Sequence, residues 1–472
     1  MSSIIRSTGK LFSANVFRSG ISFLGIIFFA RAIGSDSLGV YFLFQAVLGI
    51  CGIVADFGVK NALTKRISEG SQQESYLSAA ILIKLGTVSV VGCVIVVSQS
   101  YINWYLGEQI ARYLILGLCL QQFSQLMIGT LHGELRVGKT ATIELLEQVL
   151  WIVTSVVLFY FNYGLMALIY GFLLGKLVKL LFAWARKKTS VGWPERVHFQ
   201  SLFDYSKFSV ISSIGGFAYS WLDILIIGFF LTASHVSAYE VAWRVTTFVL
   251  LFSKALGLTV FPQISEWSSE DAVGKIESLI PTATFASLIV SIPAFFGTVL
   301  FSAEIIEYLF GAEYLLASTA IVILMLEKIF QSVHKVWGYS LQALDRPDQA
   351  AIATVVSLLV NVGLNVVLIP AFGLAGAASA TAISFALNTL LHAHFLSKSV
   401  TLSLSYDRTL WCILASVGMT TVLYGVRTLV PVTSIAVLFG LIIMGVLVYF
   451  SIILSYGPIR DDTRILMQGL IR

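Results

Sequence analysis

Ionisable side chains inside long apolar stretches are the residues of this sequence that could do chemistry. An ion at the centre of a bilayer costs about 3 kcal/mol on insertion scales, so each one needs a structural or functional reason. Arginine can bind phosphate oxygens through two parallel hydrogen bonds, and a carboxylate can hold a proton or a cation. The basic residues outnumber the acidic ones: Arg18, Lys84, Lys176, Lys179, Arg244, Lys254, Lys328 and Lys335, against Asp56, Glu144, Glu147, Asp223, Glu240 and Glu327.

Several of these charges have structural explanations. Lys176 and Lys179 lie near one end of an apolar stretch, where long side chains can reach the water interface. The two glutamates within 144–147 begin another stretch, at the depth of a helix end. Glu240 and Arg244 are four residues apart, so on a helix they can neutralise each other.

Four charges near the middle of apolar stretches are harder to explain in this way. Arg18 and Asp223 each lie deep in the first stretch of one half of the chain, and Glu327 and Lys328 are similarly central. Because contact with lipid would be costly there, we expect these side chains to face a water-filled cavity. For Arg18, a purely structural ion pair with Asp223 is the alternative.

The composition defines the elements that must position these charges. The chain has 472 residues, 57% of them hydrophobic and only 12% charged, with a mean hydropathy of +0.88. These values exclude an ordinary soluble enzyme, a disordered protein and a nucleic-acid binder. At about 20 residues per span, they predict an all-α polytopic membrane protein with about 14 transmembrane helices. The predicted spans are 11–32, 39–60, 78–99, 112–131, 143–163, 164–184, 207–231, 237–261, 280–302, 316–338, 350–370, 373–398, 409–430 and 433–456.

The distribution of lysine and arginine predicts the orientation of the spans. If the N-terminus is cytoplasmic, most of the 30 Lys and Arg residues fall in cytoplasmic segments or within spans. The outer segments, with the outer ends of the spans, then hold only Arg31, Arg112 and Arg427. Cytoplasmic loops carry the excess of basic residues in membrane proteins, so both termini are expected in the cytoplasm of a cell (inner) membrane.

The sequence also repeats itself weakly. Residues 131–141 align with 341–351, and residues 162–165 align with 371–374, in the same order along the chain. This repeat predicts two six-helix lobes, 1–195 and 196–398, related as parallel repeats. Helices 13 and 14 and a cytoplasmic tail, within 399–472, would stand outside the repeat.

Other motifs are better explained by structure than by catalysis. Residues 133–140 fit the phosphate-loop pattern G-x-x-x-x-G-K-[ST], but that motif requires a preceding strand and this segment links two apolar stretches. His392 and His394 are two residues apart and do not share a helix face, so no metal site is predicted there. All four cysteines lie in apolar runs without C-x-x-C spacing, and no catalytic constellation occupies a sizeable soluble segment.

Three stretches of the sequence resemble one family of transporters. Residues 30–62, with Leu38-Gly39-Val40-Tyr41 and Asp56-Phe57-Gly58, resemble the N-terminal signature of polysaccharide repeat-unit flippases of the Wzx-like, O-antigen type. Residues 370–378 are similar to their hairpin before the twelfth span, and residues 133–139 to their loop between spans four and five. The family belongs to a superfamily that also contains multidrug and toxin extruders and lipid II flippases.

The resemblance implies a function and a role for the buried charges. Such a protein moves a polyprenyl-(di)phosphate-linked oligosaccharide from the inner to the outer leaflet by alternating access. Its partners would be that lipid-linked oligosaccharide, membrane lipids and other polysaccharide assembly proteins, with no cofactor beyond coupling to a proton or sodium gradient. The candidate residues for binding the headgroup are Arg18, Lys84, Arg244, Lys254 and Lys328, and those for ion coupling or charge tuning are Asp223, Glu327 and Asp56.

Two other classes of protein fit parts of the sequence. A multidrug or cation extruder of the same superfamily would share the fold, but a cavity for cationic drugs favours acids over bases, and the spans show the reverse. A membrane-embedded glycosyl enzyme would need a sizeable external loop, and the predicted spans leave none. The sequence therefore predicts a transporter and not an enzyme.

Overall fold

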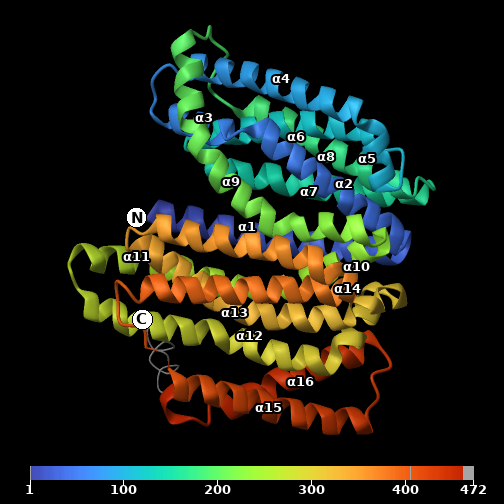
Figure 1. Ribbon diagram of the computed structural model, residues 1–472, viewed down its shortest axis with the longest axis vertical. Coiled ribbons are helices and arrows are strands. Elements are labelled where there is room, and N and C mark those ends of the chain that lie inside the picture. Colours follow the sequence, from blue (N-terminus) through green and yellow to red (C-terminus); the bar gives the residue numbers. More distant parts are fainter. Residues whose placement is uncertain (1, 404, 461–472) are drawn as a thin grey trace. The chain divides into compact units, whose positions relative to one another are not determined.

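The protein is helical throughout the residues that the structure describes (Figure 1). The computed structural model describes the backbone of residues 2–403 and 405–460, and the side chains within these ranges except 2–17 and 208–220. No strand occurs in these ranges. The long helices and the absence of strands agree with the all-α membrane fold predicted from composition.

The chain forms two compact units, Met1–Ser237 and Ala238–Arg472. The helices of the first unit are α1 (Ser2–Ile33), α2 (Ser35–Asp56), α3 (Val59–Ser68), α4 (Gln73–Val97), α5 (Gln99–Leu106), α6 (Ala111–Gly133), α7 (Val137–Tyr160), α8 (Leu165–Arg186) and α9 (Arg196–Phe230). Helix α10 (Ala233–Thr247) crosses the boundary. The second unit continues with α11 (Leu250–Ser269), α12 (Val273–Phe310), the 3-10 helix η1 (Ala312–Ala317), α13 (Ser318–Ala343), α14 (Pro347–Leu396), α15 (Tyr406–Leu429) and α16 (Ile435–Ile453).

Helix α9 bears on the predicted division into lobes. It begins at Arg196, where the second lobe was expected to start, yet it packs on α2, α3 and α4 of the first unit. The lobe boundaries at 195/196 and 398/399 therefore stay predictions.

Each predicted span lies on a helix or on a bent pair of helices. Among the described residues, 10 helices are long and apolar enough to cross a membrane, or 11 if α10 and α11, which meet at 49°, form one bent span. Helix α14 consists of two helical segments that meet at Gly373, where the backbone angles are not helical. The predicted spans 350–370 and 373–398 correspond to these two segments, although the total of fourteen stays an expectation.

The break inside α14 repeats a turn from the first unit. Gly373 has φ 58° and ψ −134°, and Gly164, between α7 and α8, has φ 50° and ψ −127°. Residues with a Cβ rarely adopt this backbone conformation, so glycine is required at both corners. The two glycines are the aligned residues of the sequence repeat, which the backbone thereby confirms.

The loops after α6 and α13 repeat one another as closely. Leu135 and Asp345 both adopt left-handed backbone conformations, with φ 57° and 55°. In each loop the next residue, Arg136 or Arg346, donates its backbone N–H to the carbonyl five positions earlier, at 2.9 Å and 3.0 Å. The two aligned loops thus share one turn geometry, which also ends α7 at Asn162 and α11 near Asp271.

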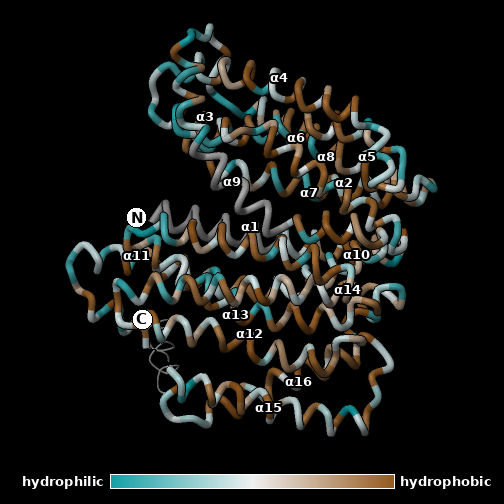
Figure 2. The backbone as a smooth tube through the Cα atoms, in the orientation of Figure 1, coloured by the Kyte–Doolittle hydropathy of each residue, from teal (hydrophilic) through white to brown (hydrophobic). Residues whose placement is uncertain are grey.

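The outer faces of these helices are apolar, as contact with lipid requires. Large apolar side chains are exposed along them, for example Val97 at 87% and Leu359 at 67%. Figure 2 shows apolar residues along the helices and hydrophilic residues concentrated at the turns between them. Because soluble monomers rarely expose large contiguous apolar patches, this surface is that of a multi-pass membrane protein.

Candidate functional site

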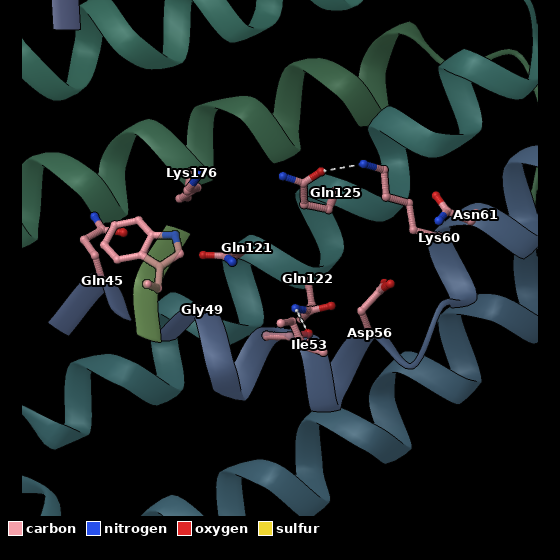
Figure 3. A pocket seen from close by; sticks show the side chains of 12 residues that line it. Gln45, Gly49, Ile53, Asp56, Lys60, Asn61, Gln121, Gln122, Gln125 and Lys176 are labelled. Carbon is pink, nitrogen blue, oxygen red and sulfur yellow. Dashed lines mark hydrogen bonds between the residues drawn. The ribbon is translucent and has the colours of Figure 1, made fainter. Parts of the chain in front are cut away.

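A cavity of about 520 Å³ lies inside the first unit, and its walls are polar (Figure 3). Helices α2, α3, α6 and α8 form most of the wall, and Trp221 of α9 completes it. The lining residues are Gln45, Gly49, Gly52, Ile53, Asp56, Lys60, Asn61, Gln121, Gln122, Gln125, Lys176 and Trp221. A site of this size is within the range of about 300–1,000 Å³ found for small-molecule pockets.

Helices α2 and α6 bring three glutamine side chains together at this cavity. Gln121, Gln122 and Gln125 lie within one turn of α6, and Gln122 donates to the Gly52 carbonyl of α2 at 2.8 Å. A Cβ at Gly52 would lie 3.2 Å from the amide nitrogens of both Gln121 and Gln122. The absence of a side chain at Gly52 therefore makes room for the amides.

A buried ion pair forms one wall of the cavity. Lys84 of α4 has no exposed side-chain surface and pairs with Asp56, which is 21% exposed and lines the cavity. The Lys84 ammonium also donates to Gln122 Oε1 at 2.6 Å. Asp56 ends α2, and the next residue, Phe57, turns left-handed with φ 44°. The predicted candidates Lys84 and Asp56 thus meet at one site, with the carboxylate facing the cavity.

Two further lysines contribute positive charge to the cavity. Lys60 donates to Gln125 Oε1 at 3.1 Å and forms no ion pair with a carboxylate in the described part of the chain. Lys176 pairs with Glu147 at 2.5 Å, and Glu147 also pairs with Lys179 at 2.8 Å. One carboxylate between two lysines leaves an excess of positive charge beside the cavity.

Arg18 has a different partner from the one considered in the sequence. Its guanidinium pairs with Glu144 of α7 at 2.5 Å, so the ion pair with Asp223 is not the one formed. The Arg18 side chain is 38% exposed and that of Glu144 is 26% exposed, so neither is fully buried in the pair. Asp223 is buried on α9. The roles of Arg18 and Asp223 in transport stay predictions.

Lys328 of the second unit lies in a dry environment. Its side chain and that of Glu327 have no exposed surface, and the two pair at 2.6 Å. The Lys328 ammonium also lies 3.5 Å from the centre of the Trp243 ring and donates to Gln331 at 3.1 Å. A carboxylate, an amide and an aromatic ring thus already surround the ammonium, and the roles of Lys328 and Glu327 in transport stay predictions.

The remaining candidates of the second unit are distributed along α10 and α11. Arg244 and Glu240 form the expected pair four residues apart, at 2.7 Å. Lys254 is exposed on α11. The headgroup roles of Arg244 and Lys254 stay predictions.

Most of the cavity wall is absent from the candidates predicted from the sequence. Those candidates are all ionisable, so they include no glutamine or asparagine, and Lys60 is not among them. The spacing of Gln121, Gln122 and Gln125 within an apolar span was the available signal, because buried amides also require partners. The cavity is therefore more amide-rich than a search for charges predicts.

The motif at 133–140 is part of a helix connection. Gly133 ends α6, Leu135 forms the left-handed turn, and residues 137–140 begin α7. The preceding element is a helix and not the strand that a phosphate loop requires. His392, the other discounted feature, packs against His334 with their ring centres 4.4 Å apart.

Comparisons with known proteins identify the family of this chain. Residues 28–319 match the family model described as "Polysaccharide biosynthesis protein". The chain is 50% identical over 469 residues to the "Probable low-salt glycan biosynthesis flippase Agl15" of Haloferax volcanii, covering 99% of each chain. It is also 28% identical over 408 residues to the "Probable flippase AglR" of the same organism, covering 85% of each.

A solved structure shares the fold. The lipid II flippase MurJ, in an inward closed conformation, matches with a TM-score of 0.79 at 19% identity, covering 98% of this chain and 100% of that chain. At this identity the match supports the fold alone. The family match over more than half of the sequence and the near full-length relative place this chain in the polysaccharide biosynthesis protein family.

Proposed function

We propose that this protein is a flippase that moves a polyprenyl-(di)phosphate-linked oligosaccharide from the inner to the outer leaflet of the cell membrane, for the synthesis of a surface glycan. The observation that carries the proposal is the 50% identity, over 99% of both chains, to a relative named as a glycan biosynthesis flippase. Membrane lipids would surround the apolar outer faces, and other glycan assembly proteins would supply and consume the cargo.

The polar cavity supports this function physically. A glycan headgroup cannot cross hydrocarbon without losing its hydrogen bonds to water, at several kcal/mol for each unsatisfied group. A cavity walled by amides and cations replaces those partners, while the polyprenyl chain remains in the lipid. Alternating access would expose the cavity first to one leaflet and then to the other.

The charges of the cavity favour an anionic cargo over a cationic drug. Lys60 and Lys176 line the cavity, whereas Asp56 is neutralised by Lys84. A multidrug extruder binding cationic compounds would gain from the opposite balance. Orientation with both termini in the cytoplasm, and coupling to a proton or sodium gradient through Asp223, Glu327 or Asp56, complete the proposed mechanism.

Reconstitution tests this function. Purified protein in liposomes that contain a polyprenyl-diphosphate-linked oligosaccharide should increase the fraction of glycan accessible to an impermeant glycosidase. Protein-free liposomes supply the baseline. Equal accessibility with and without protein would contradict the proposal, and drug tolerance without a glycan defect in a deletion and complementation assay would favour the extruder instead.

A further inference from the structure

The cavity of the first unit has the chemistry of a sugar site more than of a phosphate site. An amide both donates and accepts hydrogen bonds, as a hydroxyl does, whereas a phosphate only accepts them. Four glutamines and one asparagine line this cavity, against two lysines. A site built for phosphate alone would have little use for the five amide oxygens.

Several of these amide groups have bonding capacity left for a ligand. Gln121 makes no side-chain hydrogen bond among the described residues, although its side chain reaches the cavity (Figure 3). Gln125 accepts from Lys60 through Oε1, which leaves its Nε2 available, and Gln45 donates to Tyr41 at 2.8 Å, which leaves its Oε1 available. Donors and acceptors thus converge on the same space from α2 and α6.

The remaining side chains of the cavity wall indicate which other chemical groups the ligand has. The indole of Trp221 offers a flat apolar surface of the kind that packs against the C–H face of a sugar ring. Lys60 lacks a carboxylate partner among the described residues, so one negative charge on the ligand would complete its pairing. Glu147 already neutralises part of the charge of Lys176.

We propose that this cavity is the binding site for a single pyranose ring of the glycan, with Gln121, Gln125 and Gln45 bonding its hydroxyls and Lys60 binding one anionic group beside the ring. This inference rests on the proposed function and deepens it by naming the part of the cargo that the first unit binds. The anionic group is either the sugar's own carboxylate or the phosphate that links the first sugar to the lipid.

Binding of three soluble probes tests the assignment and separates the two sources of charge. Glucose, glucuronate and glucose 1-phosphate are titrated against full-length protein in nanodiscs, with inorganic phosphate as a fourth probe. We expect glucose to bind measurably, and one of the two anionic sugars to bind about tenfold more tightly, since one charged hydrogen bond contributes about 1.5 kcal/mol or more. The tighter of the two identifies the source of the charge.

Variants assign the binding to named side chains. Gln121→Leu should weaken all three sugars about five- to tenfold, whereas Lys60→Met should weaken the anionic sugars more than glucose. Gln99→Leu, the same change at an exposed position of α5 outside the cavity, is the matched control. Gly52→Ala is a second cavity variant that favours the helix but intrudes on the Gln121 and Gln122 amides, so it should also weaken binding.

The outcomes of these binding tests bear on the sugar site, and the liposome assay bears separately on the proposed flippase function. Absence of glucose binding, equal effects of Gln121→Leu and Gln99→Leu, or inorganic phosphate binding as tightly as glucose 1-phosphate would each overturn the sugar site. Protein that fails these tests yet moves lipid-linked glycan in liposomes keeps its proposed function. Protein that binds the sugars but moves no glycan keeps the site and loses the function.

Discussion

At the scale of residues, the structure separates charges that face a cavity from charges that are locked in dry pairs. Asp56 and Lys60 face the cavity, whereas Lys328 is enclosed by Glu327, Gln331 and Trp243. The sequence identifies which residues are costly in a membrane, because that follows from residue type and span position alone. It does not identify their partners, because pairs such as Lys84 with Asp56 depend on how helices pack.

Variants of Arg18 test whether this partly exposed, paired guanidinium takes part in transport. Arg18→Ala should reduce transport in the liposome assay far more than Arg18→Lys, because lysine keeps the charge that faces Glu144 and a passing anion. Arg112→Ala, an arginine in a predicted outer segment, is the control and should leave transport unchanged. Equal activity of the alanine, lysine and unaltered proteins would remove Arg18 from the mechanism.

The pair of Lys84 and Asp56 makes a prediction about stability. Lys84→Met alone leaves a partly buried carboxylate without its partner and should destabilise the protein by about 3–5 kcal/mol. The double variant Lys84→Met with Asp56→Asn should recover much of that loss. Denaturation in detergent measures both, and Lys275→Met, in a loose exposed pair with Glu270, should change stability by less than about 1 kcal/mol. A double variant no more stable than the single one would show that the pair does not act as a unit.

At the scale of elements, the turns between helices carry more information than the helices themselves. Apolar stretches predicted where the helices lie, but their length could not show that residues 350–370 and 373–398 join without a loop. The aligned glycines did mark the corners, since Gly164 and Gly373 share a backbone conformation that other residues rarely adopt. The bend between α10 and α11 has no comparable signal, because Thr247 and Leu250 can both occupy a regular helix.

The corner at Gly373 predicts an asymmetry between two glycines of α14. Gly373→Ala should destabilise the protein by about 1–3 kcal/mol, because a Cβ strains this backbone even though nothing lies within 4 Å of it. Gly363→Ala, at an equally open position with helical geometry, should be neutral or stabilising by up to about 1 kcal/mol. Thermal unfolding of both variants checks this, and similar shifts would contradict the argument from φ.

The segment that follows α8 is held by a carboxylate, which predicts a pH dependence. Glu134 accepts backbone N–H groups of Lys188 and Thr189 at 2.7 and 2.8 Å, and the Thr189 hydroxyl at 2.9 Å. Partial burial would raise the pKa of Glu134, but these hydrogen bonds and that from Arg136 outweigh it, so the pKa lies below the ordinary value of 4.5. The stabilisation that the Glu134 carboxylate gives to the segment after α8 is therefore complete above pH 4.5. It is lost as the pH falls through the lowered pKa of Glu134.

Hydrogen exchange of residues 187–195 measures this effect. Protection of the Lys188 and Thr189 amides should persist at pH 4.5 and decline only at lower pH, whereas Glu134→Gln should reduce it at every pH. Glu69→Gln, which removes an exposed carboxylate paired with Arg66, is the control and should leave these amides unchanged. Protection that already declines above pH 4.5 would contradict a lowered pKa.

At the scale of the whole molecule, composition was sufficient for the fold class, whereas the lobe boundaries that the repeat indicates stay predictions. The amide-rich cavity was not predictable in the same way, because its wall comes from four helices spread over residues 45–176 and from Trp221. The predicted orientation in the membrane rests on the distribution of basic residues. The repeat adds a second constraint to this prediction. Equivalent turns of the two halves must lie on the same side of the membrane.

Cysteine labelling tests this orientation with residues matched by the repeat. After replacement of the four native cysteines, Tyr163→Cys and Phe372→Cys, both exposed at helix corners, should react with an impermeant thiol reagent in intact cells. Leu135→Cys and Asp345→Cys should react only after permeabilisation. Labelling of all four sites in intact cells, or of one member of a matched pair alone, would contradict the predicted topology.

The left-handed turn shared by Leu135 and Asp345 affects the stability of the two loops unequally. Aspartate tolerates this backbone well, whereas for leucine the conformation costs about 1–2 kcal/mol. Glycine has no such cost, so Leu135→Gly would relieve the turn without changing its backbone path. The loop after α6 thus holds stability that one substitution could recover, whereas the aspartate of the aligned loop leaves little to gain.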